Sequence, residues 1–280
     1  MAVQQVRVSL VAGSVAMDAL CAGYESKVWR SDALVEDVFD RHLLTFALSY
    51  SEAKNVTSAT AIRSIRDAAV SVYTTDKYRR RGEFGELLLH AALVDFYDAE
   101  PAVSKIYYED SSNDVVKGFD SVHVVADTAG SLKIWLGEAK FYSDLDGAMR
   151  SVLQDIETHL ARDFLRKEFV FITRKVDDAW PHATAFKEMI ARARSLDEIS
   201  TSLVMPIFLT YDSEAVDAHD VVGDEYIAAL TAETAAALEE FESRVAKPLE
   251  VEIRLILVPL KSKAKLVDLM HAKLKALQGI

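Results

Sequence analysis

Residues 117–140 read KGFDSVHVVADTAGSLKIWLGEAK, and this stretch decides the fold. Two apolar runs, 119–126 and 132–139, flank the turn-forming tetrapeptide DTAG, a pattern that predicts a β-hairpin. A tight turn midway brings the start of the first strand opposite the end of the second. Asp120 and Glu138 should therefore meet at one end of a two-stranded ribbon.

The hairpin also predicts a chemistry. Side chains alternate along a strand, so Glu138 and Lys140 share one face, which the preceding apolar residues continue. Charges that continue an apolar face are costly unless they are paired or bind a metal. With Asp120, they form a group of two carboxylates and one ammonium. Such carboxylates suit Mg²⁺, while a lysine can orient water and offset developing charge, as phosphodiester hydrolysis requires.

Outward from the hairpin, the hydrophobic pattern predicts an α/β protein with a mixed sheet flanked by helices. A strand is expected where Val6, Val8 and Leu10 alternate, and Thr57 and Ser58 are plausible caps for the second helix. The other expected strands are 103–109, 168–173, 203–210 and 250–258. The expected helices are 33–49, 57–75, 82–97, 144–167, 182–195, 223–246 and 263–277.

Composition narrows the function classes. Of 280 residues, 50% are hydrophobic and the formal net charge is −12, which argues against indiscriminate coating of nucleic acid. The single cysteine, Cys21, excludes an internal disulfide and fits a reducing compartment. No apolar run approaches the roughly 18–20 residues of a membrane span, so we expect a cytoplasmic protein without a membrane. No Walker loop is present, so the chain should not hydrolyse ATP.

The Asp…Glu-x-Lys pattern resembles the core of the PD-(D/E)xK nuclease superfamily. This resemblance implies a restriction-endonuclease-like sheet in which Asp120 and Glu138 bind Mg²⁺, with Mn²⁺ as an alternative, and Lys140 positions the attacking water. It also implies an upstream helix that bears a further glutamate. Glu83 and Glu86 are three residues apart, hence on one helical face, and we favour Glu86 over Glu83.

Two departures from the superfamily pattern are visible. Phe119 stands where the superfamily name has proline, and this difference does not affect the metal-binding role implied for Asp120 and Glu138. Gln154, 14 residues after Lys140, resembles the glutamine that lines the site in some branches. The tyrosine that accompanies that glutamine is replaced by Thr158, which puts the similarity of this helix in doubt.

A closer resemblance is to the HamA family, the nuclease subunits of the Hachiman antiphage defence system. Three segments carry it: RGEFGELLLH at 81–90, KGFDSVH at 117–123 and WLGEAKFY at 135–142. The family implies a DNA nuclease with little sequence specificity, held by the superfamily 2 helicase HamB and released on infection. The alternative is a non-catalytic interaction module that docks on and restrains a helicase.

On this resemblance, residues 79–175 are expected to form the nuclease core. Residues 1–78 should pack an N-terminal strand and helices on it, and 176–280 should be an α/β extension of the same globular unit. Three consecutive arginines and one lysine are candidates for holding the DNA backbone, although an acidic partner surface would suit the arginines equally. These residues are Arg79, Arg80, Arg81 and Lys117.

Two histidines near the candidate site allow two interpretations. His90 and His123 could shuttle protons, but packing or capping is the interpretation we favour for both. By strand alternation His123 lies on the face of Ser121, opposite Asp120, which argues against direct ligation by His123.

Overall fold

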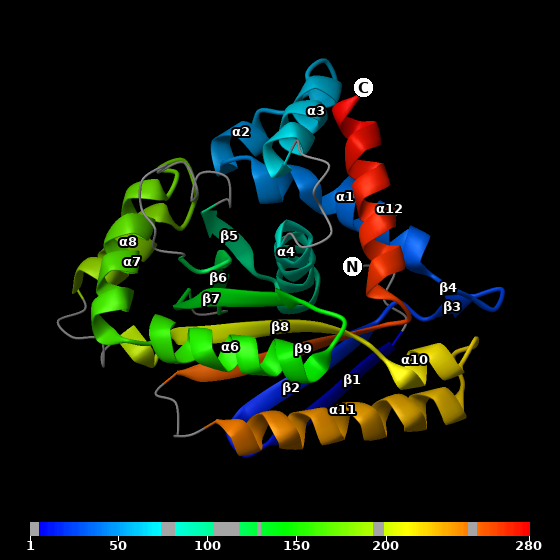
Figure 1. Cartoon of the computed structure of the whole chain (residues 1–280). Coiled ribbons are helices and arrows are strands. Elements are labelled where there is room, and N and C mark those ends of the chain that lie inside the picture. The colour runs from blue at the N-terminus through cyan, green and yellow to red at the C-terminus, as the bar shows by residue number, and fades with distance from the viewer. Residues whose placement is uncertain (1–5, 74–81, 104–117, 128–129, 193–198, 246–250) are drawn as a thin grey trace.

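A seven-stranded mixed sheet lies between helices in the computed structural model (Figure 1). The structure describes residues 6–73, 82–103, 118–127, 130–192, 199–245 and 251–280. Within these ranges the strand order is β1-β2-β9-β8-β7-β6-β5. The strands are β1 (Val6–Ala12), β2 (Val15–Cys21), β5 (Glu100–Val103), β6 (Ser121–Ala126), β7 (Leu132–Phe141), β8 (Leu203–Asp212) and β9 (Glu252–Leu260). A separate ribbon pairs β3 (Tyr24–Glu25) with β4 (Val28–Trp29).

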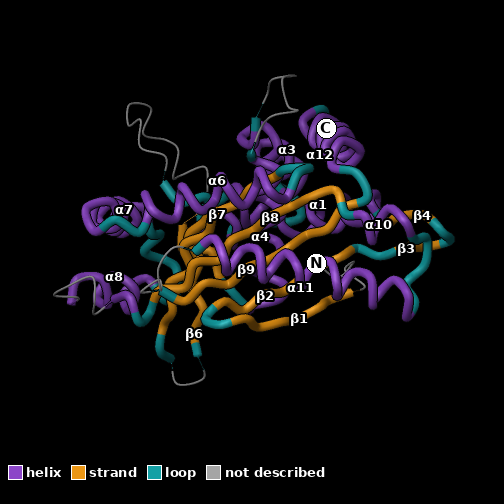
Figure 2. The backbone as a smooth tube through the Cα atoms, turned by 60° about the horizontal axis from the view of Figure 1, so that its bottom comes forward, coloured by secondary structure: helices purple, strands orange, loops and turns teal. Residues whose placement is uncertain are grey.

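The four central strands β2, β9, β8 and β7 are parallel, and antiparallel pairs complete both edges. Figure 2 shows these strands side by side. β9 lies between β2 and β8, so a strand from the C-terminal part of the chain joins the N-terminal hairpin to the rest of the sheet. The expected α/β class, with a mixed sheet flanked by helices, is confirmed.

The helices cover the sheet. α4 packs against β5, β6 and β7 and also against α1. α6 contacts β7 and β8, and α11 contacts β1 and β2. α12 packs beside α1 and α3 (Figure 1). The longer helices are α1 (Ser31–Ala47), α3 (Ala61–Val72), α4 (Glu83–Tyr97), α6 (Leu145–His159), α7 (Arg162–Lys175), α8 (Ala183–Arg192), α11 (Asp224–Arg244) and α12 (Lys263–Gln278). The short ones are α2 (Tyr50–Lys54) and α10 (Glu214–Ala218).

β7 is covered by helices on both faces. On one face α4 approaches so closely that a Cβ added to Gly85 would lie 2.8 Å from Cβ of Phe141. On the other face Glu138 and Lys140 contact side chains of α6. The period of two along a strand explains this division, because successive side chains point to opposite faces.

Most predicted elements agree with the structure, but the segment after β7 does not. A helix over 144–167 followed by a strand over 168–173 is wrong, since α6 ends at His159 and α7 continues to Lys175. Leu165, Phe169 and Ile172 are buried at spacings of four and three residues, which is helical periodicity. Packing of this face overrides the local strand preference of the Phe169–Thr173 run.

Smaller differences concern strands and caps. β2 and the short helices α2 and α10 were not expected, and the strand expected at 103–109 begins earlier, at Glu100. Its continuation, 104–109, lies outside the described residues. The N-cap of α3 is Thr60, not Thr57 or Ser58, whereas Ser49 forms a capping box at the start of α2.

We expect Gly85→Ala to destabilise the protein by about 1–3 kcal/mol, because the new methyl group would force α4 away from Phe141. Urea unfolding followed by circular dichroism measures the change. Gly279→Ala is the matched control, since its Cβ would meet only ordinary contacts at 3.6 Å. Equal stability of the two variants would contradict a tight α4–β7 contact.

A second prediction concerns pH. Burial raises the pKa of Glu168, on α7, from 4.5 to about 7. As the pH rises from 4.5 through 7, the folded state must hold a charge that burial disfavours, so stability falls. Glu168→Gln should therefore be more stable than the parent at pH 8, by about 1–2 kcal/mol after allowance for residual solvation. The gain should shrink toward pH 4.5 in thermal unfolding, and a constant gain would contradict burial as its cause.

Candidate active site at the β6–β7 hairpin

The hairpin register places Asp120 beside Glu138. Ser121 pairs with Gly137 and Ala126 with Leu132 across β6 and β7. One residue before β6, the Asp120 amide donates to the carbonyl of Gly137 at 2.9 Å, and its Oδ2 accepts from the amide of Ala139 at 2.9 Å. The carboxylate of Asp120 is thereby fixed at the end of the ribbon.

Glu138 is a buried carboxylate with two basic neighbours. Its side chain is 3% exposed; Oε1 lies 2.5 Å from Nδ1 of His159, and Oε2 lies 3.8 Å from Nζ of Lys140. Burial and the like charge of Asp120 raise the pKa of Glu138, and His159 and Lys140 offset this only in part. A divalent cation would relieve both the desolvation and the repulsion.

Lys140 is held by a second carboxylate. Its Nζ lies 2.5 Å from Oδ2 of Asp155, closer than to Glu138. Burial lowers the pKa of Lys140, but Asp155, Glu138 and Asp120 together outweigh burial and the net change is upward. The ammonium is therefore charged at neutral pH.

Asp155 and His159 were not singled out from the sequence. They lie one turn apart on α6, whereas Gln154, the residue that was chosen, is exposed. The apolar stripe of α6 could have found them, because Ala148 and Val152 are buried and the same spacing continues through 155 and 159. A shift of one residue on a helix turns the side chain by about 100°.

The predicted glutamates lie on α4. Glu86 is buried, with 9% exposure, and Glu83 is half-buried. α4 packs on the face of β7 opposite to the one that carries Glu138 and Lys140. The role of either glutamate stays a prediction. The candidate DNA contacts lie outside the described residues: Arg79, Arg80, Arg81 and Lys117.

His90 and His123 form a buried pair beside the site. Nδ1 of His90 lies 2.9 Å from Nε2 of His123, and Nε2 of His90 lies 2.9 Å from Oγ1 of Thr45. Both histidines, with Asp120 and Ser121, line a small pocket. Burial lowers the pKa of His123 to about 3 and that of His90 well below its usual value, so both are neutral. These contacts favour the packing interpretation.

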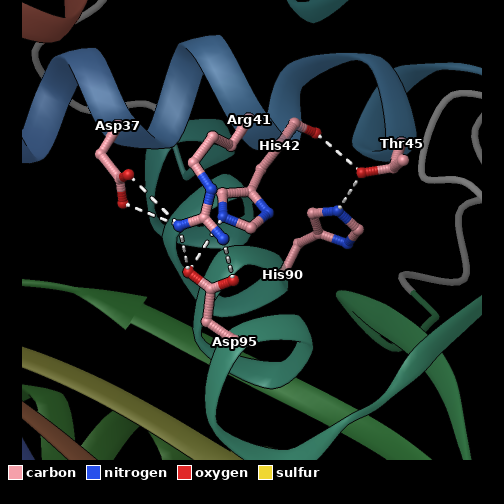
Figure 3. Close-up of polar contacts among 6 residues, drawn as sticks. All are labelled: Asp37, Arg41, His42, Thr45, His90 and Asp95. Atoms are coloured by element: carbon pink, nitrogen blue, oxygen red, sulfur yellow. Dashed lines mark hydrogen bonds and ion pairs between the residues drawn. The ribbon is translucent and has the colours of Figure 1, made fainter. Parts of the chain in front are cut away.

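A separate polar cluster joins α1 to α4 (Figure 3). Asp37, His42 and Asp95 each offer a ligand atom within 4.8 Å of the others, a possible metal site. Arg41 already occupies its centre, with nitrogens 2.8 and 2.9 Å from the two oxygens of Asp95 and 3.2 Å from Asp37. Burial, assisted by Arg41, lowers the pKa of His42 to about 4, so His42 is neutral. An ion here would have to displace the guanidinium.

We expect Asp95→Asn to destabilise the protein by about 1–3 kcal/mol, because an asparagine keeps one uncharged acceptor oxygen where the two carboxylate oxygens of Asp95 contact both Arg41 and His42. Asp37→Asn removes only an i,i+4 contact from the same arginine and should cost less than about 0.5 kcal/mol. Thermal unfolding of both variants in EDTA measures the difference. If both behave alike in EDTA, and added Zn²⁺ stabilises the parent alone, the cluster is a metal site.

Comparison with known proteins identifies one family. A family model described as HamA matches residues 4–274, which is nearly the whole chain. No curated protein matches the sequence. Among the residues that the structure describes, no helix combines the length and the apolar character needed to cross a membrane.

Proposed function

Since the chain belongs to the HamA family, whose members are components of the Hachiman antiviral defence system, we propose a function for it. We propose that it is a metal-dependent deoxyribonuclease of the PD-(D/E)xK type. The observation that carries the proposal is the grouping of Asp120, Glu138 and Lys140 at the end of the β6–β7 hairpin. Phosphodiester hydrolysis with little sequence specificity is the activity we assign to this group.

The donor set fits Mg²⁺. Two carboxylates, Asp120 and Glu138, are close enough that one raises the pKa of the other, and Glu138 is almost wholly buried. Mg²⁺ is commonly held by one or two carboxylates, and Mn²⁺ accepts the same oxygen ligands. When bound, the ion would polarise the phosphoryl group and acidify water.

Lys140 supplies the cationic group. Its side chain is 14% exposed and charged, so its ammonium can orient a water toward phosphorus and offset charge that develops on the phosphoryl oxygens. Glu86, or Glu83 in its place, is the acidic residue that we propose to complete the group from α4. Gln154 is exposed, which leaves it the weakest of the proposed contributors.

DNA and the helicase HamB are the proposed partners. A net charge of −12 disfavours unaided binding to a polyanion, so delivery of DNA by a helicase would explain how an acidic chain reaches its substrate. Arg79, Arg80, Arg81 and Lys117 are the proposed backbone contacts. We propose a cytoplasmic location, where DNA and such a helicase would meet the protein.

We expect Glu138→Gln and Lys140→Ala each to reduce DNA cleavage at least about 100-fold, since the first removes a carboxylate proposed to bind Mg²⁺ and the second removes the ammonium proposed to stabilise the reacting phosphate. The assay follows plasmid and linear DNA with Mg²⁺, with and without HamB and ATP. Lys133→Ala is the matched control, because Lys133 lies on the same strand but is half-exposed and bound to Glu252.

Three outcomes would change the proposal. Cleavage by Glu138→Gln at the parental rate would contradict an active site at the β6–β7 hairpin. Robust cleavage by the isolated chain in physiological salt would contradict control by a partner. A complex with HamB that forms normally while no protein cuts would favour the interaction module.

A further inference from the structure

We propose that α6 carries two positioning residues, His159 for the carboxylate of Glu138 and Asp155 for the ammonium of Lys140. The proposal rests on the nuclease function proposed above and adds two residues to that site. Both contacts are 2.5 Å long, and both come from one helical turn. Neither residue is part of the Asp…Glu-x-Lys pattern.

The contact of His159 with Glu138 is buried and is held by aromatic packing. Nδ1 of His159 and Oε1 of Glu138 lie 2.5 Å apart as an ion pair, and neither of these buried atoms makes a hydrogen bond of standard geometry to a described residue. The imidazole stacks on Phe164, with centroids 4.6 Å apart, and meets the edge of Phe119 at 5.1 Å. Two aromatic rings therefore fix the plane of the imidazole, and the imidazole fixes Oε1.

This contact decides which oxygen of Glu138 can bind a cation. With Oε1 occupied by His159, Oε2 is the oxygen turned toward Lys140. Groups that orient a metal-binding side chain commonly act in this way, by engaging the part of it that does not touch the metal. His159 thus presents Glu138 as a ligand through one defined oxygen.

Asp155 keeps Lys140 away from Glu138. Nζ of Lys140 lies 2.5 Å from Asp155 but 3.8 Å from Glu138. Without Asp155, the nearest remaining carboxylate among the described residues would be Glu138, and a lysine paired there would compete with a cation for Oε2. Asp155 therefore keeps Oε2 of Glu138 available for a cation and holds Nζ of Lys140 in position.

Hydrogen bonds in the loop between β7 and α6 fix where α6 begins. Asp144 caps α6 by accepting from the amide of Gly147 at 2.8 Å. Oγ1 of Thr210 donates to the carbonyl of Tyr142 at 2.8 Å, and the amide of Asp212 donates to the carbonyl of Ser143 at 2.9 Å. β8 thus anchors the loop, and the anchored loop fixes how α6 lies over β7.

Binding of Mn²⁺ alone, measured by electron paramagnetic resonance on the full chain, tests the role of His159. His159→Phe keeps an aromatic ring against Phe119 and Phe164 but removes Nδ1, so we expect affinity for Mn²⁺ to fall about 10- to 100-fold. His159→Asn places an amide near the position of Nδ1 and should restore binding to within a few-fold of the parent. Glu157→Gln, on the exposed side of the same helix, is the control and should bind like the parent.

Parental Mn²⁺ affinity in His159→Phe would overturn the proposal for this residue. Circular dichroism and thermal unfolding accompany each variant, so that a folding defect is distinguished from lost binding. If His159→Phe does not fold, His159→Leu takes its place with the same expectation.

The role of Asp155 is tested by a double-mutant cycle with Lys140. Asp155→Asn should weaken Mn²⁺ binding several-fold because Lys140 moves onto Glu138. In a Lys140→Met background the same substitution should have a clearly smaller effect, since no ammonium remains to compete. Equal losses in both backgrounds would show that Asp155 acts only as a negative charge, which contradicts positioning.

DNA cleavage measured in parallel separates this inference from the proposed function. If the parent binds Mn²⁺ and the variants weaken it as expected, but no protein cuts DNA with HamB present, the nuclease function fails and the positioning roles stand. If the parent cuts DNA and His159→Phe binds Mn²⁺ normally, the positioning role fails and the nuclease function stands. A parent that binds no Mn²⁺ overturns the inference directly.

Discussion

The alternation of side chains along β7 is the constraint on which the rest of the structure depends. β7 is covered by a helix on each face, so its buried residues from Gly137 to Phe141 must suit α4 or α6. The α4 face includes Gly137, where an added Cβ would collide with Oγ of Ser121 and the side chain of Leu89. The α6 face carries Glu138 and Lys140. Close packing on one side thus fixes the strand that presents charge on the other.

Burying the charges on the α6 face of β7 costs stability, and contacts between opposite charges offset this cost. Glu138 lies almost wholly out of water, and isolated burial of a carboxylate is unfavourable. His159, Lys140 and Asp155 form a chain of alternating basic and acidic groups around it. Removing one member leaves another buried and poorly paired, so the members depend on one another.

Local sequence signals predicted the hairpin and α4 well, because a turn tetrapeptide and an apolar helix need no tertiary information. They failed where the decision depended on distant contacts. The Phe169–Thr173 run has strand-forming residues, but its burial against the core follows a helical period. Asp155 and His159 were missed for a related reason. Which residues of α6 reach β7 depends on which face of the helix is buried. The motif comparison pointed to Gln154, which is exposed.

The position of β9 has a consequence for how the molecule assembles during synthesis. β9 follows the other described strands in the chain, yet it occupies an interior place between β2 and β8. Until residues 252–260 leave the ribosome, the β1–β2 hairpin has no neighbour with which to continue the sheet. The nascent chain therefore carries two unjoined pieces with open edges, which is a slow and exposed way to fold. The sheet can therefore be completed only after β9, the last of the described strands, has been synthesised.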